Sequence, residues 1–210
     1  MVADGIYYAL ALSAGRALVV WLTRPWFGLP LFVLALFCLY FFRDPERSIP
    51  AGRVAVSPAD GKVVAVKMES PTVTRVSIFL NIFDVHVNRT PISGKITDVE
   101  YHKGQFLVAS KEEASAQNEQ NTVTVEGDGT RVRFKQIAGL IARRIVSFVR
   151  EGESVGTGQR IGLIRFGSRV DVYLPPACGA LVAPGQRAVG GETVFADLKS
   201  QEGEREARLQ

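Results

Sequence analysis

Two long apolar runs at the start of the chain most strongly limit how it can fold. Ile6 to Leu22 carries Arg16 as its only charge, and Trp26 to Phe42 is apolar throughout. At about 1.5 Å per residue, the second run would extend roughly 25 Å as a helix, a marginal crossing of a hydrocarbon core about 30 Å thick. Neither run has a polar face, which argues against a core helix of a soluble domain. We therefore predict a hydrophobic membrane anchor over residues 1–47.

The flanks of the apolar runs support an anchor over a signal peptide. Arg24 and Arg43 follow the two runs, and Arg43-Asp44-Pro45 stands where a signal peptide would have a small-residue cleavage site. We expect either a tight helical hairpin or one in-plane helix followed by a spanning one. Arginines lie on both sides of the runs, so charge only weakly favours a catalytic domain on the cytoplasmic face of the cell membrane. Aromatic side chains suited to a membrane interface are Trp21, Trp26, Tyr40, Phe41 and Phe42.

From Ile49 onward the sequence changes to short β-branched runs broken by Gly and Pro, which predicts a β-rich domain over residues 48–198. One short stretch, Lys111 to Gln117, has weak helical character, and the charged tail, residues 199–210, is predicted to fray. The expected strands are Val54 to Val56, Lys62 to Val66, Thr72 to Leu80, Lys95 to Tyr101, Thr122 to Glu126, Thr130 to Ile137, Arg144 to Val149, Arg160 to Phe166, Arg169 to Leu174 and Thr193 to Leu198.

A recurring pattern of a hydrophobic residue, a Gly turn and a strand refines the fold class. It occurs at Val155 to Gly162 and at Val189 to Val194. This recurring pattern is similar to that of the barrel-sandwich folds of lipoyl and biotinyl carriers. No lysine stands at the turn between matched apolar residues, so we do not predict a carrier. The expected fold is mainly β, a barrel-sandwich domain with an N-terminal apolar helical anchor.

Composition narrows the classes of partner. The net charge is +4 and the pI about 9.2, a basic excess that favours an anionic surface such as lipid headgroups. No basic run is interleaved with aromatic residues, so nucleic acid is not expected. Cys38 and Cys178 form neither a metal-ligand spacing nor a disulfide framework, which fits a reducing cytoplasm, and we predict no metal site. Imidazole chemistry is confined to His86 and His102, the only histidines.

The dipeptide Gly167-Ser168 places a hydroxyl beside an unhindered carbonyl, between an apolar run and an alternating strand. Alone it predicts only a turn. Three further motifs precede it: Phe41-Phe42-Arg43-Asp44-Pro45-Glu46-Arg47, Ser57-Pro58-Ala59-Asp60-Gly61 and Phe83-Asp84-Val85-His86-Val87-Asn88-Arg89-Thr90-Pro91. Together, from about Phe41 to Leu198, these motifs resemble the short form of the phosphatidylserine decarboxylase proenzymes, a family of self-cleaving pyruvoyl enzymes.

The resemblance implies that the chain makes its own cofactor. Decarboxylation of an amino acid needs a carbonyl that accepts electrons as CO₂ leaves, and no unmodified side chain supplies one. In this family the chain cuts itself, here at Gly167-Ser168, and Ser168 becomes a covalent pyruvoyl group. The β chain would end at Gly167 and the α chain would begin at residue 168. The expected product of the reaction on phosphatidylserine is phosphatidylethanolamine, a membrane phospholipid.

Further site residues follow from the same resemblance. His86 matches the catalytic histidine, which would move protons in both stages. Asp60 matches an acidic partner of self-cleavage, although Asp-Gly is also a common turn pair. Arg89 replaces a second histidine that longer members use for processing, and arginine is not a base at ordinary pH. Either His86 serves both stages, or Arg89 polarises the Gly167 carbonyl or binds a substrate anion.

Several alternatives stay open at this point. The substrate is phosphatidylserine or another lipid with a serine headgroup, such as archaetidylserine. The chain is otherwise a noncatalytic membrane-anchored barrel-sandwich adaptor, or a serine peptidase with Ser168 as nucleophile. The two product chains would form a heterodimer, and pairing of strand edges makes a higher oligomer plausible. Arg43 and Arg47 hold lipid phosphates or are plain flanking charges, and Asn118 to Asn121 is expected to be a solvated loop.

Overall fold

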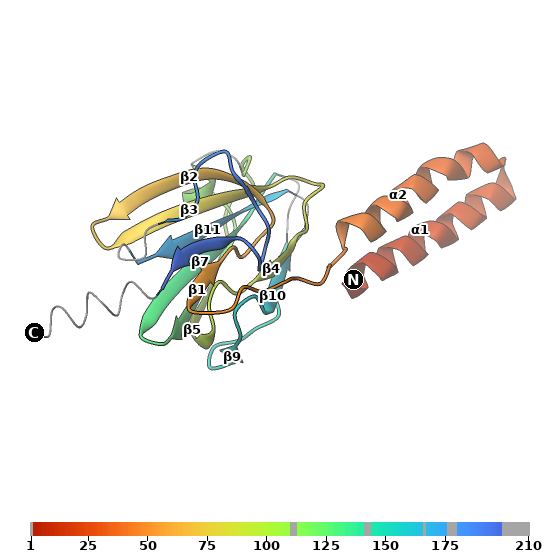
Figure 1. Cartoon of the computed structure of the whole chain (residues 1–210). Helices are drawn as coiled ribbons and strands as arrows, with labels where there is room; N and C mark the ends of the chain where they lie inside the picture. The colour runs from red at the N-terminus through yellow and green to blue at the C-terminus, as the bar shows by residue number, and fades with distance from the viewer. Residues whose placement is uncertain (1, 110–112, 141–143, 166, 176–179, 199–210) are drawn as a thin grey trace, which may run out of the picture. The chain divides into compact units, whose positions relative to one another are not determined.

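The computed structural model describes residues 2–109, 113–140, 144–165, 167–175 and 180–198. The chain divides into two compact units, Met1–Glu46 and Arg47–Gln210. The first holds helices α1 (Ala3–Leu22) and α2 (Leu29–Phe41), joined by the 3₁₀ turn η1 (Pro25–Gly28). Figure 1 shows the two helices side by side, so the hairpin alternative of the two expected arrangements is the one adopted.

Small residues allow the two helices of the hairpin to approach closely. A Cβ on Gly5 would lie 2.5 Å from the Phe42 Cβ, and one on Gly28 would lie 2.6 Å from the Val20 Cγ2. The Val2 N–H donates to the Phe42 carbonyl at 3.1 Å, so the start of α1 lies beside the end of α2. Within the described part of the chain, α1 alone is long and apolar enough to cross a membrane, and the apolar helix Pro25–Phe41 is shorter.

The outer surface of the hairpin is apolar, which a soluble domain seldom tolerates. Trp21 and Trp26 flank the turn between the helices, and each is 79% exposed. The other exposed large apolar side chains of this unit are Ile6, Tyr7, Tyr8, Leu10, Leu18, Leu22, Phe27, Leu29, Phe32, Val33, Leu34, Leu36 and Tyr40.

The second unit is built from antiparallel strands. The main sheet has eight strands in the order β12-β2-β3-β11-β7-β6-β5-β9, and it curls into a half-barrel (Figure 1). The predicted fold class, a mainly β barrel-like domain with an apolar helical N-terminus, is confirmed. The strands of this sheet are β2 (Gly61–Ser70), β3 (Val73–Leu80), β5 (Gly94–His102), β6 (Gln120–Gly127), β7 (Thr130–Ala138), β9 (Ser154–Val155), β11 (Ser168–Leu174) and β12 (Arg187–Ala188).

Two smaller sheets complete the unit, and each forms from segments far apart in the sequence. The first pairs β1 (Val54–Val56) with β13 (Val194–Asp197). The second has the order β4-β10-β8, from β4 (Val87–Arg89), β10 (Arg160–Ile164) and β8 (Ile145–Ser147). All ten predicted strands are present, whereas β4, β9 and β12 were not predicted. The weak helical prediction, Lys111 to Gln117, corresponds to α3 (Ala114–Gln117). Residues 111 and 112 of that prediction, and the predicted tail over residues 199–210, lie outside the described residues.

Strand β11 lies inside the main sheet and pairs along both edges. Ser168, its first residue, is opposite Leu80 of β3 and Ala138 of β7. Val170 and Val172 alternate with polar residues and are fully buried in the core. The segment after Gly167 is therefore fixed by two ladders of hydrogen bonds and by one apolar face.

The other face of β11 carries a buried cluster of charges. The Asp171 carboxylate accepts hydrogen bonds from Arg169 Nε at 2.7 Å, from Arg75 Nη1 at 3.3 Å and from Ser115 Oγ of α3 at 2.5 Å. Arg169 also donates to Ser77 Oγ at 2.8 Å. The exposed fractions of Arg169, Arg75 and Asp171 are 1%, 4% and 0%. Two buried guanidinium groups therefore share one carboxylate that is shielded from water, and Arg75 also donates from Nε to Glu69 Oε1 at 2.5 Å.

Loss of that carboxylate should destabilise the domain. We expect Asp171→Ala, in a Ser168→Ala background that keeps the chain in one piece, to lower the free energy of unfolding by about 3–5 kcal/mol, because the buried Arg169 and Arg75 guanidinium groups lose the carboxylate that they share. Urea denaturation of the full chain in detergent, followed by circular dichroism, measures the change. The control is Glu126→Ala, which breaks an exposed pair with Arg131 at 3.2 Å and should cost less than about 1 kcal/mol. Equal losses would contradict this account.

Candidate active site

His86 lies immediately before β4 and is fully buried. A turn closed by the Asp84 carboxylate, which accepts from the Asn81 N–H at 2.9 Å, leads the chain into this position. The His86 carbonyl then accepts from the N–H of Ile164, the last residue of β10, at 3.3 Å. Pairing between β4 and β10 thus brings this histidine to the point where β10 ends.

The hydrogen bonds of the His86 ring assign its tautomer. Nδ1 lies 2.9 Å from the Asp84 carbonyl oxygen, which can only accept, so Nδ1 carries the proton. Nε2 is then an acceptor, and it receives the Gly167 N–H at 3.2 Å. A neutral imidazole therefore directs a lone pair at the Gly167 N–H, one peptide unit before the Gly167-Ser168 bond.

Gly167 and Ser168 meet the requirements of a reactive peptide in different ways. Gly167 has a φ of +68°, a left-handed conformation that costs residues with a Cβ about 1 kcal/mol or more. Ser168 is fully buried, and within the described ranges its Oγ has no hydrogen-bond partner. Buried hydroxyls are normally bonded, so an unbonded one next to a glycine that is hydrogen-bonded to a histidine indicates a chemical role.

Asp60 lies in a second cluster. Arg47 Nη2 donates to both Asp60 carboxylate oxygens at 2.9 Å, and the Gly190 N–H donates to Oδ1 at 2.8 Å. In the described part of the chain, these are the hydrogen bonds and ion pairs of Asp60, so no direct bond joins it to His86. Arg47, one of two candidates for a lipid phosphate, is engaged here instead, with a side chain that is 10% exposed.

Arg89, at the end of β4, belongs to the same second cluster. It is 7% exposed, and its Nη1 donates to the Gly158 carbonyl at 3.0 Å. Its Cδ lies 3.1 Å from the position that a Cβ on Gly191 would occupy, beside the turn that Asp60 holds. The structure thus groups Arg47, Asp60 and Arg89 around Gly190 and Gly191, and groups His86 with Gly167. Strand β4 connects the two, because His86 precedes it and Arg89 ends it.

Asn118 to Asn121 is not the solvated loop that we predicted. Asn118 is 1% exposed and Asn121 is 3% exposed, and Gln120 begins β6. The polar composition was misleading because Asn118 bonds to the backbone of Leu107 and Ala138, and Asn121 bonds to the Gln136 side chain, inside the domain. His102, in contrast, is exposed, at the end of β5, with Nε2 3.4 Å from Glu100.

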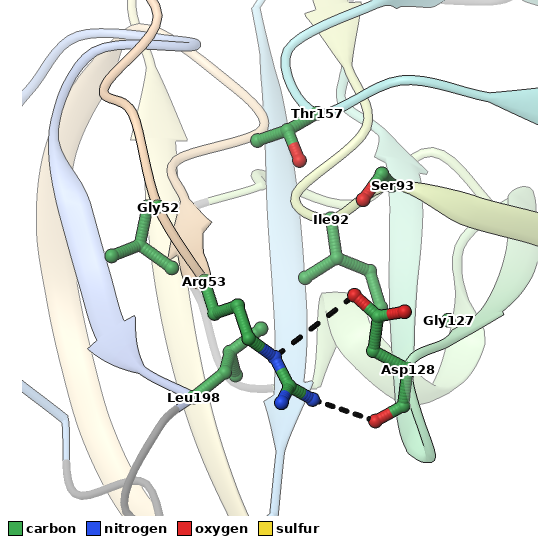
Figure 2. Close-up of a pocket in the computed structure, with 9 residues that line it drawn as sticks. Gly52, Arg53, Ile92, Ser93, Gly127, Asp128, Thr157 and Leu198 are labelled. Atoms are coloured by element: carbon green, nitrogen blue, oxygen red, sulfur yellow. Dashed lines mark hydrogen bonds and ion pairs between the residues drawn. The ribbon is translucent and has the colours of Figure 1, made fainter.

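A small pocket lies where the segment before β1 meets the turn between β6 and β7 (Figure 2). Arg53 crosses it, with Nη2 donating to the Asp128 carbonyl at 2.8 Å and Nε 4.0 Å from the Asp128 carboxylate. None of the predicted site residues lines this pocket, so it is separate from the candidate active site. Within the described ranges, no cluster of three or more His, Cys, Asp or Glu side chains is arranged to hold a metal ion.

Comparison with known proteins gives a consistent match. The family model described as phosphatidylserine decarboxylase matches residues 34–196. A phosphatidylserine decarboxylase proenzyme of Solibacter usitatus is 65% identical over 196 residues, which cover 93% of this chain and 96% of the relative. A proenzyme of the same name from Rhodospirillum rubrum is 44% identical over 208 residues, which cover 93% of this chain and 88% of the relative.

The contact between His86 and Gly167 generates a prediction about self-cleavage. We expect His86→Ala to slow cleavage at Gly167-Ser168 by about 100-fold or more, because general acid–base groups contribute roughly 10²–10⁴ in rate. Intact mass of the full chain, sampled over time after synthesis, measures the uncut fraction. His102→Ala removes the other, exposed histidine and should cleave at the wild-type rate. Unchanged cleavage in a folded His86→Ala protein would contradict the assignment.

Proposed function

The chain belongs to the phosphatidylserine decarboxylase family, and from this premise we propose that it decarboxylates phosphatidylserine to phosphatidylethanolamine after cutting itself at Gly167-Ser168. The observation that carries the proposal is the hydrogen bond from the Gly167 N–H to His86 Nε2, beside a buried Ser168 hydroxyl. Relatives that cover nearly the whole chain are named as proenzymes of this activity. Their names support both the reaction and a preceding cleavage.

Self-cleavage begins with the Ser168 hydroxyl. Its oxygen bonds to the Gly167 carbonyl carbon while His86 takes the hydroxyl proton. The carbon–nitrogen bond of the peptide then breaks, and the Ser168 nitrogen recovers that proton, which leaves an ester between the two residues. The neutral imidazole of His86 is suited to this transfer, since its acceptor nitrogen already faces the same segment.

The ester then opens by elimination. A base removes the Cα proton of residue 168, the Cβ–Oγ bond breaks, and Gly167 leaves as a terminal carboxylate. Residue 168 is now a dehydroalanine with a free nitrogen; protonation at Cβ and addition of water release ammonia and leave a ketone. We assign the Cα proton to His86 as well, because it returns to the neutral form after the first transfer.

The residues at the new N-terminus fit a pyruvoyl group. Such a group supplies an electrophilic carbonyl that accepts the electron pair as CO₂ departs. Position 168 is buried and begins a strand that is paired on both sides, so the group would be held away from bulk water. Arg169, bonded to Asp171 and Ser77, fixes the next residue. We assign the proton of the product carbon to His86.

Asp60 and Arg89 receive supporting roles in this proposal. Asp60 holds Arg47 and the Gly190 amide, and Arg89 lies against the same turn. His86 directly precedes β4, a strand of three residues, and Arg89 is its last residue. Holding Arg89 in place therefore restricts the position of His86. We propose that this cluster orients His86 during self-cleavage, with Asp60 balancing the charge of Arg47 and Arg89.

The two chains made by cleavage should stay together as a heterodimer. The smaller chain starts with β11, which pairs with β3 and β7 of the larger chain, and it also supplies β12 and β13. Removing it would leave two inner strand edges and the core face of β11 exposed to water. This interleaving supports an enzyme of two chains from one precursor.

The experiment that tests the function is intact mass of the purified chain under denaturing conditions, combined with a lipid decarboxylation assay. We expect two chains divided at Gly167-Ser168, the smaller one blocked by a ketone that borohydride reduces, and CO₂ release from phosphatidylserine. Ser168→Ala should give one uncut chain without activity, and Asp60→Asn should cut more slowly than wild type. An active protein with an intact serine at position 168 would refute the proposal.

We further propose that the hairpin inserts into the cell membrane with the catalytic unit on the cytoplasmic face, where its lipid substrate is reached at headgroup depth. Val2 and Phe42 are hydrogen-bonded, so both ends of the hairpin emerge on one side, and the catalytic unit follows five residues after Phe42. The apolar outer surface of the hairpin and the exposed Trp21 and Trp26 beside its turn fit a bilayer and its interface.

Cysteine labelling tests this arrangement. Asp4→Cys reports the membrane face of the N-terminus, and Glu151→Cys reports that of the catalytic unit. Each is made in a chain with both native cysteines changed to serine. A membrane-impermeant maleimide should miss both positions in intact spheroplasts and label both in inside-out vesicles. Labelling of the two positions from opposite faces would contradict a hairpin with both ends on one side.

A further inference from the structure

The scissile carbonyl lies against a glycine on the neighbouring strand. A Cβ on Gly139, the residue after β7, would lie 2.2 Å from the Gly167 carbonyl oxygen and 3.1 Å from its carbon. Real Cβ atoms do not approach a carbonyl so closely. Gly139 is not among the described glycines with positive φ, so its backbone would accept alanine. What excludes a side chain at Gly139 is chiefly the scissile peptide itself.

Gly139 and Gly167 therefore have opposite requirements. Gly167 has a left-handed φ of +68°, yet a Cβ on it would meet nothing within 4 Å. Gly139 has an ordinary backbone, yet its missing Cβ is the space that the Gly167 carbonyl occupies. The carbonyl is thus packed on one side by the Gly139 backbone, which limits how it can turn.

Asn118 fixes the peptide that carries Gly139. Its Nδ2 donates to the Ala138 carbonyl at 2.7 Å and to the Leu107 carbonyl at 2.8 Å, and its Oδ1 accepts from the Leu107 N–H at 2.8 Å. The Ala138 N–H donates to the Glu119 carbonyl at 2.9 Å. Both polar groups of Ala138 are therefore held by the same short segment.

The segment around Leu107, which Asn118 holds, also contacts the Gly139 position through Ala109. The Cβ of Ala109, two residues after Leu107, lies 3.2 Å from the place that a Cβ on Gly139 would take. Asn118 is 1% exposed and Ala109 is 3% exposed, so water does not compete for these contacts. The Asn118 carboxamide, bonded to the backbone of both Leu107 and Ala138, thus holds in place the segments that pack around Gly139 and the Gly167 carbonyl.

We propose that Gly139 and Asn118 are positioning residues for self-cleavage: they orient the Gly167 carbonyl so that Ser168 Oγ attacks its carbon. The inference rests on the proposed self-cleavage and assigns it two residues that do not themselves react. In the step they serve, the bond from Ser168 Oγ to the Gly167 carbon forms, the peptide carbon–nitrogen bond breaks, and the hydroxyl proton passes to the Ser168 nitrogen. A misplaced carbonyl slows this step steeply, since about 1 Å of displacement can cost roughly 100-fold.

Gly139→Ala is the first test. We expect it to lengthen the half-time of cleavage by about 100-fold, measured as the uncut fraction by intact mass of the full chain. The matched control is Gly127→Ala at the end of β6, where a Cβ would lie 2.0 Å from the Ser93 carbonyl oxygen, again with an ordinary φ. Both variants push on a backbone carbonyl, so both should lose thermal stability, whereas only Gly139→Ala should cleave slowly.

Asn118→Ala is the second test, and it decides the matter if Gly139→Ala does not fold. We expect roughly tenfold slower cleavage, because the Ala138 and Leu107 carbonyls lose their donor. Asn121→Ala is its control: it removes a carboxamide of similar burial, three residues further along, whose Nδ2 donates to Gln136 Oε1 at 3.0 Å. Asn121→Ala should leave the cleavage rate within about twofold of wild type.

Hydroxylamine separates a positioning role from general loss of structure. It attacks an ester at the Gly167 carbonyl, giving a Gly167 hydroxamate and a free Ser168 amine, and so it reports how much ester has formed. If Gly139 and Asn118 serve ester formation, hydroxylamine will speed cleavage of wild type but hardly that of Gly139→Ala or Asn118→Ala. Full rescue of both variants would overturn the inference, because ester formation would then be intact.

Failure of this inference can be told from failure of the proposed function. A wild-type chain that never divides at Gly167-Ser168 would remove the proposed function, and this inference with it. A wild-type chain that divides, together with folded Gly139→Ala and Asn118→Ala proteins that divide at the same rate, would remove only the positioning roles. Slow cleavage in both variants, with normal cleavage in Gly127→Ala and Asn121→Ala, would establish them.

Discussion

The pairing of β11 on both of its edges is the constraint from which the rest of the catalytic unit follows. Ser168 opposes Leu80 on one side and Ala138 on the other, so the first residue of the strand has little freedom. A chain that cuts itself at this point must keep the new end in place without a covalent link. Two ladders of backbone hydrogen bonds and a buried apolar face meet that demand, because neither depends on the peptide that is lost.

The Gly167-Ser168 peptide lies where the chain passes from one sheet to another. Strand β10 belongs to the sheet with β4, and β11 belongs to the eight-stranded sheet, so Gly167 lies in the short connection between the two sheets. His86 approaches this connection from β4, and Gly139 approaches it from the end of β7. These neighbours on both sides limit how the Gly167-Ser168 peptide can turn, and the left-handed φ of Gly167 is a conformation that glycine adopts at little cost.

Polar groups inside this domain have distinct tasks. Asp171 binds Arg169, Arg75 and Ser115 of α3, which secures the strand that follows Gly167. Burial lowers the pKa of Lys135 and raises the pKa of Tyr173 on the same face, both close to Asp171. The Asp60 cluster instead fixes a turn at the other end of β4. The buried Arg169 and Asp60 are each bonded to an oppositely charged side chain, whereas the Ser168 hydroxyl, which is proposed to react, is left unbonded within the described part of the chain.

The sequence alone determined the apolar helical start, ten of the strands and the peptide at Gly167-Ser168, because hydrophobic periodicity and turn residues are local signals. It predicted His86 as a site residue only through ordered motifs. Three short strands, the burial of Asn118 and the pairing of Arg47 with Asp60 came from the tertiary structure, since each depends on partners far along the chain. Gly139 shows the physical reason. In the sequence it cannot be told from other glycines that follow strands, because only the tertiary structure brings the Gly167 carbonyl to the position that a Gly139 side chain would occupy.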